Sequence, residues 1–284
     1  MTTSSALPAV PGMRRADLAR PEGVRWLPAL PSGDGVLVLA GSSGRVDGER
    51  ARLFAEHGAL AESIRWFGGE GQSAGPWDVP LETFVDRLDS LARECDRVWL
   101  VGTSFGAEAA LATAARAPGV SGVFAFAPSD VVWAGYDPAG AEHSHWTWGG
   151  APVPFVPIDQ ECRGTEEPPR FSPVYERSRR TFADRVAAAA IEVERIAEVV
   201  VVAGGDDQVW SSSLYAENIR CRRADHGADT VVVAGALAGH RAILPGESLV
   251  RGGMAMRRGG TEVADRELGT RAWRAITAML AASR

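Results

Sequence analysis

The chain of 284 residues is poor in cysteine, lacks a long apolar run and has no excess of basic residues. Its three cysteines, Cys95, Cys162 and Cys221, are scattered and form no Cys-x-x-Cys pair or other zinc-binding spacing. We therefore expect reduced thiols, a cytoplasmic location and no metal site. No stretch of 18 uncharged apolar residues occurs, so we expect no membrane span.

The sequence also lacks a signal-peptide pattern and a positive net charge. The N-terminus lacks a basic segment followed by an apolar one, so we expect no signal peptide. The net charge is −6 and the isoelectric point is about 5.5, which argues against nucleic acid or an anionic membrane surface as the main partner. The sequence leaves the oligomeric state open.

The hydrophobic content of 45% is enough for a full core, and its pattern alternates between two periods. Apolar runs predict strands at 35–40, 98–101, 122–127, 199–203 and 230–234, with a weaker one at 59–66. Helical spacing lies between them, at 47–57, 81–94, 107–115, 183–196, 211–224 and 265–280. This alternation predicts the α/β class, with a mostly parallel, doubly wound sheet covered on both faces.

The alternation of predicted strands and helices begins near residue 31 and is interrupted once, and these two points define the expected domain organisation. Residues 1–30 show no clear period, and we expect a flexible lead-in before one domain at 31–284. An aromatic and proline-rich insertion at about 133–183 interrupts the alternation, and we expect it to form a lid. Four of its side chains are candidates for the substrate pocket: Trp133, Trp146, Trp148 and Phe155.

The segment Gly102-Thr103-Ser104-Phe105-Gly106 follows a predicted strand and precedes a predicted helix. A Gly-x-Ser-x-Gly pattern in this setting is typical of a nucleophile elbow, in which a strained turn lifts the serine toward a substrate. Ser104 is therefore the candidate nucleophile, and the alternative is a serine that only caps the helix.

A serine nucleophile needs a base, and the base needs an orienting acid. Asp206 and Asp207 follow the strand at 199–203, and the pattern Gly204-x-x-Asp favours Asp207 as the acid. His240 follows the strand at 230–234 and is the candidate base. Two other histidines end predicted helices and two lie in the insertion, and we expect no metal site at these: His57, His226, His143 and His145.

The oxyanion hole is expected to combine the backbone N–H of Phe105 with one from the loop after the first strand, where Ser42 or Ser43 would donate. Glu108, four residues after the serine, is interpreted as a surface or groove residue. Three arginines are interpreted as solvated charges, with anchors for an anionic substrate tail as the alternative: Arg45, Arg50 and Arg65.

Several blocks of sequence resemble a known family when they are read in order. GVLVLAGSSGRVDGERARLFAEHG, VGTSFGAEAAL and VVAGGDDQVWSS resemble the C-terminal catalytic domain of the acyl-CoA thioesterase / bile acid-CoA:amino acid N-acyltransferase family, from about Gly35 onward. The resemblance implies an α/β-hydrolase fold without a cofactor, which opens small-molecule or carrier-bound acyl thioesters through an acyl-enzyme. Asp207 and His240 fall at the family's acid and base positions.

The identity of the elbow residue separates two branches of this family. It is serine in the thioesterases and cysteine in the conjugating enzymes, so Ser104 favours hydrolysis. The chain has no room for the N-terminal β-sandwich of the larger members, and Phe105 stands where a small or basic residue is common, which would narrow the pocket. Acyl transfer to an amine or alcohol, a carboxylesterase and a non-catalytic binding protein are the alternatives.

Overall fold

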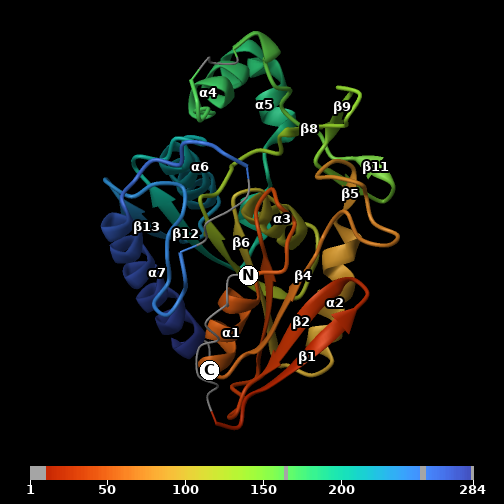
Figure 1. Cartoon of the computed structure of the whole chain (residues 1–284), viewed down its shortest axis with the longest axis vertical. Helices are drawn as coiled ribbons and strands as arrows, with labels where there is room; N and C mark the ends of the chain where they lie inside the picture. Colours follow the sequence, from red (N-terminus) through yellow and green to blue (C-terminus); the bar gives the residue numbers. More distant parts are fainter. Residues whose placement is uncertain (1–10, 163–165, 250–253, 283–284) are drawn as a thin grey trace.

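A central sheet of eight strands organises the molecule in this computed structural model, which describes residues 11–162, 166–249 and 254–282 (Figure 1). The strand order is β1-β2-β4-β3-β6-β7-β12-β13. Only β2 runs antiparallel to its neighbours, and every other pair in the order from β4 to β13 is parallel. The strands span Arg14–Ala19 (β1), Glu22–Leu27 (β2), Asp34–Leu39 (β3), Leu60–Ile64 (β4), Arg97–Thr103 (β6), Val120–Phe126 (β7), Glu198–Gly204 (β12) and Val231–Gly235 (β13).

Helices cover both faces of this sheet because its inner strands are apolar on both sides. On β3, Leu37 and Leu39 face the cluster that includes α2, α3 and α6, whereas Val36 and Val38 face the cluster with α1 and α7. The helices span Gly48–Glu56 (α1), Glu82–Ala92 (α2), Phe105–Ala114 (α3), Ser212–Asp225 (α6) and Glu262–Ala282 (α7). The predicted mostly parallel, doubly wound architecture is confirmed.

The N-terminal segment differs from the flexible lead-in expected for residues 1–30. Residues 14–27 form the hairpin β1–β2, and β2 pairs with β4, so this segment extends the sheet; residues 1–10 lie outside the described part. The sequence pattern does not predict these strands, because hydrogen bonds between backbones hold the hairpin at the end of the sheet, where an apolar period is not needed. The charged side chains of β1 suit an edge strand, because they disfavour pairing with another chain.

The insertion at 133–183 gathers at one end of the molecule, at the top of Figure 1, and we call it the cap. The cap contains short strands and helices: Ala134–Tyr136 (β8), Glu142–Ser144 (β9), Trp146–Trp148 (β10), Ala151–Pro152 (β11), Gln160–Cys162 (η1) and Ser172–Thr181 (α4). β10 pairs with Val79–Pro80 (β5), so the cap is hydrogen-bonded to the main domain. Among the described residues, no helix has both the length and the apolar composition needed to cross a bilayer.

The helix predicted at 183–196 is shorter than expected. It ends at Ala189 (α5, Ala183–Ala189), and a separate 3-10 turn follows at Val193–Arg195 (η2). Ala190 is extended and forms an isolated bridge with Val131. Pairing between segments distant in sequence thus ends the helix where the local period would continue it.

Arg50 is buried, although the sequence suggested a solvated charge. Its guanidinium donates to both carboxylate oxygens of Glu247, at 2.6 and 2.9 Å, to Thr103 Oγ1 at 2.8 Å and to the carbonyl of Ala242 at 3.1 Å. Burial opposes the charge of Arg50, but the carboxylate of Glu247 outweighs it and raises the pKa of Arg50. This one side chain therefore ties α1 to the end of β6 and to the loop beyond β13.

We expect Arg50→Ala to lower the free energy of unfolding by about 3–5 kcal/mol, because it leaves the Glu247 carboxylate buried without its partner. Urea denaturation measures the change. Arg65→Ala is the matched control, since Arg65 pairs with Glu22 at the surface and such pairs contribute at most about 1 kcal/mol. Equal losses in the two variants would contradict this assignment.

Candidate active site

The turn between β6 and α3 has the geometry of a nucleophile elbow. Ser104 has φ 59° and ψ −123°, a backbone conformation that L-residues rarely adopt. A Cβ at Gly102 would lie 2.0 Å from the carbonyl oxygen of Gly106, and one at Gly106 would lie 2.4 Å from those of Leu39 and Ala40. Only glycine fits at these two positions, which explains the spacing of the motif.

The groups proposed for the oxyanion hole flank this serine. The first N–H groups of α3 have no acceptor within the helix, and that of Phe105 comes directly after Ser104. On the other side, a Cβ at Gly41 would lie 3.7 Å from Ser104 Oγ, so the loop after β3 contacts the serine. Ser42 and Ser43 in that loop are exposed, and the choice between them stays open.

A buried carboxylate–imidazole pair lies beyond the ends of β12 and β13. His240 Nδ1 donates to Asp207 Oδ2 at 2.8 Å, and both residues are at most 9% exposed. The backbone N–H groups of Val209 and Trp210 donate to Asp207 Oδ1 and fix the carboxylate. Because an ionised carboxylate has no hydrogen to give, Nδ1 carries the proton and Nε2 is left as the basic nitrogen.

The two adjacent aspartates lie in different surroundings, and only Asp207 bonds the imidazole of His240. Asp206 is exposed, and its carboxylate accepts the N–H of Gly260 at 2.8 Å and the amide of Gln208 at 3.2 Å. The hydrogen bond from Gly260 is the main cause that lowers the pKa of Asp206. Asp206 therefore shapes the turn, whereas Asp207 orients the imidazole.

An aromatic side chain that sequence analysis missed connects the serine segment to the histidine. The ring of Trp210 lies 5.6 Å from that of Phe105 and 5.7 Å from that of His240, between centroids. Trp210 is fully buried, and its indole N–H donates to the carbonyl of Ala127 beyond β7. Its position three residues after Asp207 was the one available signal.

Two of the four predicted pocket residues are wrong. Trp133 and Trp146 are 0% exposed, with their indole N–H groups bonded to Ser129 Oγ at 2.9 Å and Glu108 Oε1 at 2.8 Å. A large ring whose polar atom is satisfied is most stable inside the core, and there it cannot line an open pocket. Trp148 on β10 is 37% exposed and Phe155 is half-buried, and their role in the pocket stays a prediction.

The interpretation of Glu108 as a surface or groove residue is wrong, because its side chain is 0% exposed. The small residues of α3 let the sheet and the cap close around the whole helix, so no face of it is left for solvent. Glu108 accepts three hydrogen bonds from the cap, and its partners include His145.

The other histidines have structural partners. His57 and His226 bond backbone carbonyls at the ends of α1 and α6, and His143 bonds Asp78 at 2.7 Å. Among the described residues, no group of three or more metal-binding side chains is found.

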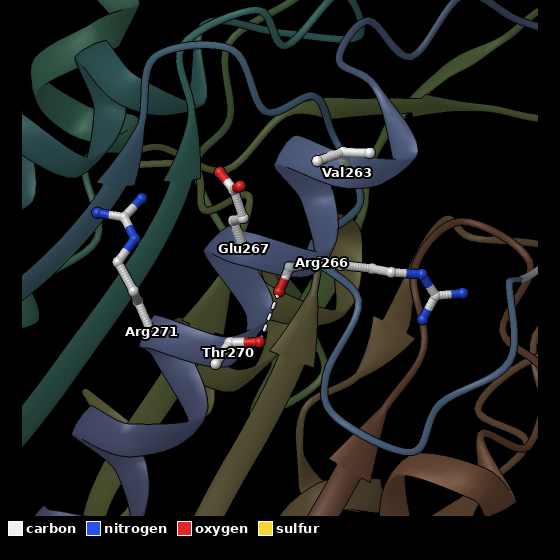
Figure 2. Close-up of a pocket in the computed structure, with 5 residues that line it drawn as sticks. All are labelled: Val263, Arg266, Glu267, Thr270 and Arg271. Atoms are coloured by element: carbon white, nitrogen blue, oxygen red, sulfur yellow. Dashed lines mark hydrogen bonds between the residues drawn. The ribbon is translucent and has the colours of Figure 1, made fainter.

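A hollow of about 500 Å³ lies on α7, well separated in sequence from the elbow (Figure 2). It is lined by Val263, Arg266, Glu267, Thr270 and Arg271. None of Ser104, Asp207 and His240 lines this hollow.

The family model described as BAAT / Acyl-CoA thioester hydrolase C terminal matches residues 83–276, a range that includes Ser104, Asp207 and His240. The chain belongs to this family. The matched range begins later than the resemblance seen in the sequence, which started near Gly35. Comparison with curated proteins gives no match.

Solved structures similar to this family member share its fold. A putative dienelactone hydrolase from Klebsiella pneumoniae subsp. pneumoniae has 13% identity and a TM-score of 0.55, with 95% of this chain and 98% of that chain covered. A puromycin-hydrolyzing peptidase from Mycobacterium tuberculosis has 13% identity and a TM-score of 0.53, with 94% and 40% covered. A hormone-sensitive lipase from a metagenome library has 13% identity and a TM-score of 0.50, with 95% and 88% covered.

These likenesses establish the α/β-hydrolase fold, and with the family match they place the chain among hydrolases of that type. At this level of identity the neighbours carry no information on substrate.

We expect Gly106→Ala to slow the reaction of this family member with an active-site serine probe by at least about 10²-fold, because the methyl group would push the end of β3 and its loop away from Ser104. The measurement is the labelling rate with a fluorophosphonate, with circular dichroism to check the fold. Gly227→Ala is the control: it has φ +75° and open space around the new Cβ, so only stability falls. Labelling of Gly106→Ala at the wild-type rate would refute the role of this packing.

Proposed function

We propose that the chain hydrolyses acyl thioesters through an acyl-enzyme, with Ser104 as nucleophile, His240 as general base and Asp207 as the orienting acid. The observation that carries the proposal is the buried hydrogen bond of 2.8 Å between His240 Nδ1 and Asp207 Oδ2. This pair lies at the same end of the sheet as Ser104. Phe105, the residue after Ser104, contacts the ring of Trp210, and Trp210 contacts the ring of His240. A base that is already held in one tautomer suits proton transfer from a serine hydroxyl.

The acylation step follows from these roles. Ser104 Oγ attacks the thioester carbonyl carbon while its proton passes to His240 Nε2, and the carbonyl oxygen becomes an oxyanion. The N–H of Phe105 and one N–H of the loop at Ser42 or Ser43 stabilise that charge. Collapse of the intermediate breaks the carbon–sulfur bond, and the thiolate leaves with the proton from His240.

Deacylation reverses the proton path with water in place of the thiol. His240 Nε2 takes a proton from a water molecule, the hydroxide attacks the acyl carbon, and Ser104 Oγ recovers the proton as the free acid leaves. Asp207 keeps its negative charge throughout and stabilises the imidazolium that forms in each step.

The family description and the serine at the elbow support a thioester substrate carried by coenzyme A or a carrier protein. The same residues also cleave oxygen esters, and an amine or alcohol that outcompetes water would turn hydrolysis into acyl transfer. A screen of acyl-CoA chain lengths beside simple esters, with and without free amines and alcohols, separates these reactions by their products.

We expect Ser104→Ala to lower kcat by about 10⁴-fold or more and to abolish fluorophosphonate labelling, because the variant lacks the hydroxyl that is proposed to form the acyl-enzyme. The assay is acyl-CoA hydrolysis with mass spectrometry of the labelled protein. Retained turnover in this variant would remove Ser104 from the mechanism, and a wild-type chain that never labels would favour a binding protein.

The neighbouring aspartates provide an internal control for the acid. We expect Asp207→Asn to lower kcat by about 10⁴-fold, since the amide favours the wrong imidazole tautomer. Asp206→Asn makes the same substitution one residue earlier. The Asp206 carboxylate bonds the N–H of Gly260 and not His240, so kcat should stay within a few-fold of wild type. A larger loss of kcat in Asp206→Asn than in Asp207→Asn would reverse the assignment.

A further inference from the structure

A second buried carboxylate–imidazole pair lies beside Phe105. His145 Nδ1 donates to Glu108 Oε1 at 2.9 Å, and the two side chains are 2% and 0% exposed. Glu108 lies in the first turn of α3, and its own N–H donates to the carbonyl of Ser104 at 3.0 Å. His145 comes from the cap, so this pair joins the nucleophile helix to the insertion.

Glu108 Oε1 accepts all three hydrogen bonds that the described residues of the cap donate to this carboxylate. Besides His145, the indole of Trp146 donates to Oε1 at 2.8 Å and the backbone N–H of Trp133 donates at 3.3 Å. Oε2 is buried and has no partner among the described residues. The carboxylate is thus satisfied on one side only.

A half-satisfied buried carboxylate is a poor choice for stability alone. An apolar side chain of the same size would avoid the desolvation of the charge, and an unpaired buried polar atom costs about 1–3 kcal/mol. The cost of burying Glu108 therefore indicates a role other than stability. Its hydrogen bond fixes the orientation of the His145 imidazole.

The imidazole of His145 transmits this orientation to Phe105. The two ring centroids are 4.1 Å apart, the shortest ring separation in the cluster around the elbow. On its far side the imidazole is closed in, because a Cβ at Gly135 would lie 3.0 Å from His145 Cδ2. The ring of Phe105 therefore contacts both His145 and Trp210, and Trp210 in turn contacts His240.

We propose that His145, held by Glu108, is a positioning residue that sets Phe105 and thereby aims the Phe105 N–H at the oxyanion. The inference rests on the proposed function, which makes that N–H an oxyanion donor. Phe105 carries both the packed ring and the donating N–H, so a shift of the ring moves the donor. A displacement of about 1 Å in such a group lowers the rate by about 10²-fold.

Two substitutions at His145 separate its ring from its hydrogen bond. His145→Asn places an amide N–H where Nδ1 was, so the bond to Glu108 stays and the ring contact with Phe105 is lost. We expect kcat to fall by about 10–100-fold, with KM within threefold and Tm within a few degrees of wild type. His145→Phe keeps a ring against Phe105 and loses the bond that anchors it, so kcat should fall less than in His145→Asn while Tm falls more.

This crossed pattern distinguishes positioning from a structural role, in which kcat would follow Tm in both variants. His143→Asn is the matched control, since His143 lies two residues away and bonds Asp78 instead of approaching Phe105, and it should leave kcat unchanged. If His145→Phe does not fold, His145→Asn alone decides the question.

A folded His145→Asn with kcat within threefold of wild type would overturn the inference. That result leaves the proposed function intact as long as the wild-type chain labels at Ser104 and Ser104→Ala is inactive. Failure of the proposed function appears instead as turnover in Ser104→Ala, whatever the His145 variants do.

Discussion

The architecture of the site depends on how closely two backbones approach at the elbow. Gly106 lies against the carbonyls of Leu39 and Ala40, where a single methyl group would be 2.4 Å from either oxygen. This contact brings the end of β3 against the start of α3, next to Ser104 with its φ of 59°. Because the loop after β3 begins at that point, the same contact decides where both proposed oxyanion donors lie relative to the serine.

Much of this arrangement can be read from the sequence, and for physical reasons. Strands buried on both faces must be apolar throughout, so β3, β6, β7 and β12 appear as continuous runs. The elbow requires glycine at two positions where any side chain would collide with backbone, and that requirement leaves a spacing in the sequence. Asp207 and His240 follow strands whose carboxyl ends meet at one edge, so topology alone brings them together.

The residues that were misjudged are those whose environment is created by distant segments. Arg50 and Glu108 are charged, and nothing within a few residues of either shows that Glu247 or the cap would bury them. Trp133 and Trp146 were recognised as important aromatics, yet only the fold reveals that they face inward. The hairpin at 14–27 is held by hydrogen bonds between strands, which leave no period in its sequence.

The two carboxylate–imidazole pairs illustrate how one chemical unit takes different roles in different surroundings. Asp207 is bonded through both oxygens, by His240 on one side and by backbone N–H groups on the other. Glu108 is bonded through one oxygen, and its imidazole is packed against Phe105 instead of facing a hydroxyl. A base needs a free nitrogen beside the substrate, whereas a support needs a rigid ring against a neighbour. The first pair therefore suits the proton transfer proposed for it, and the second suits the proposed support of Phe105, whose ring contacts both His145 of the cap and Trp210.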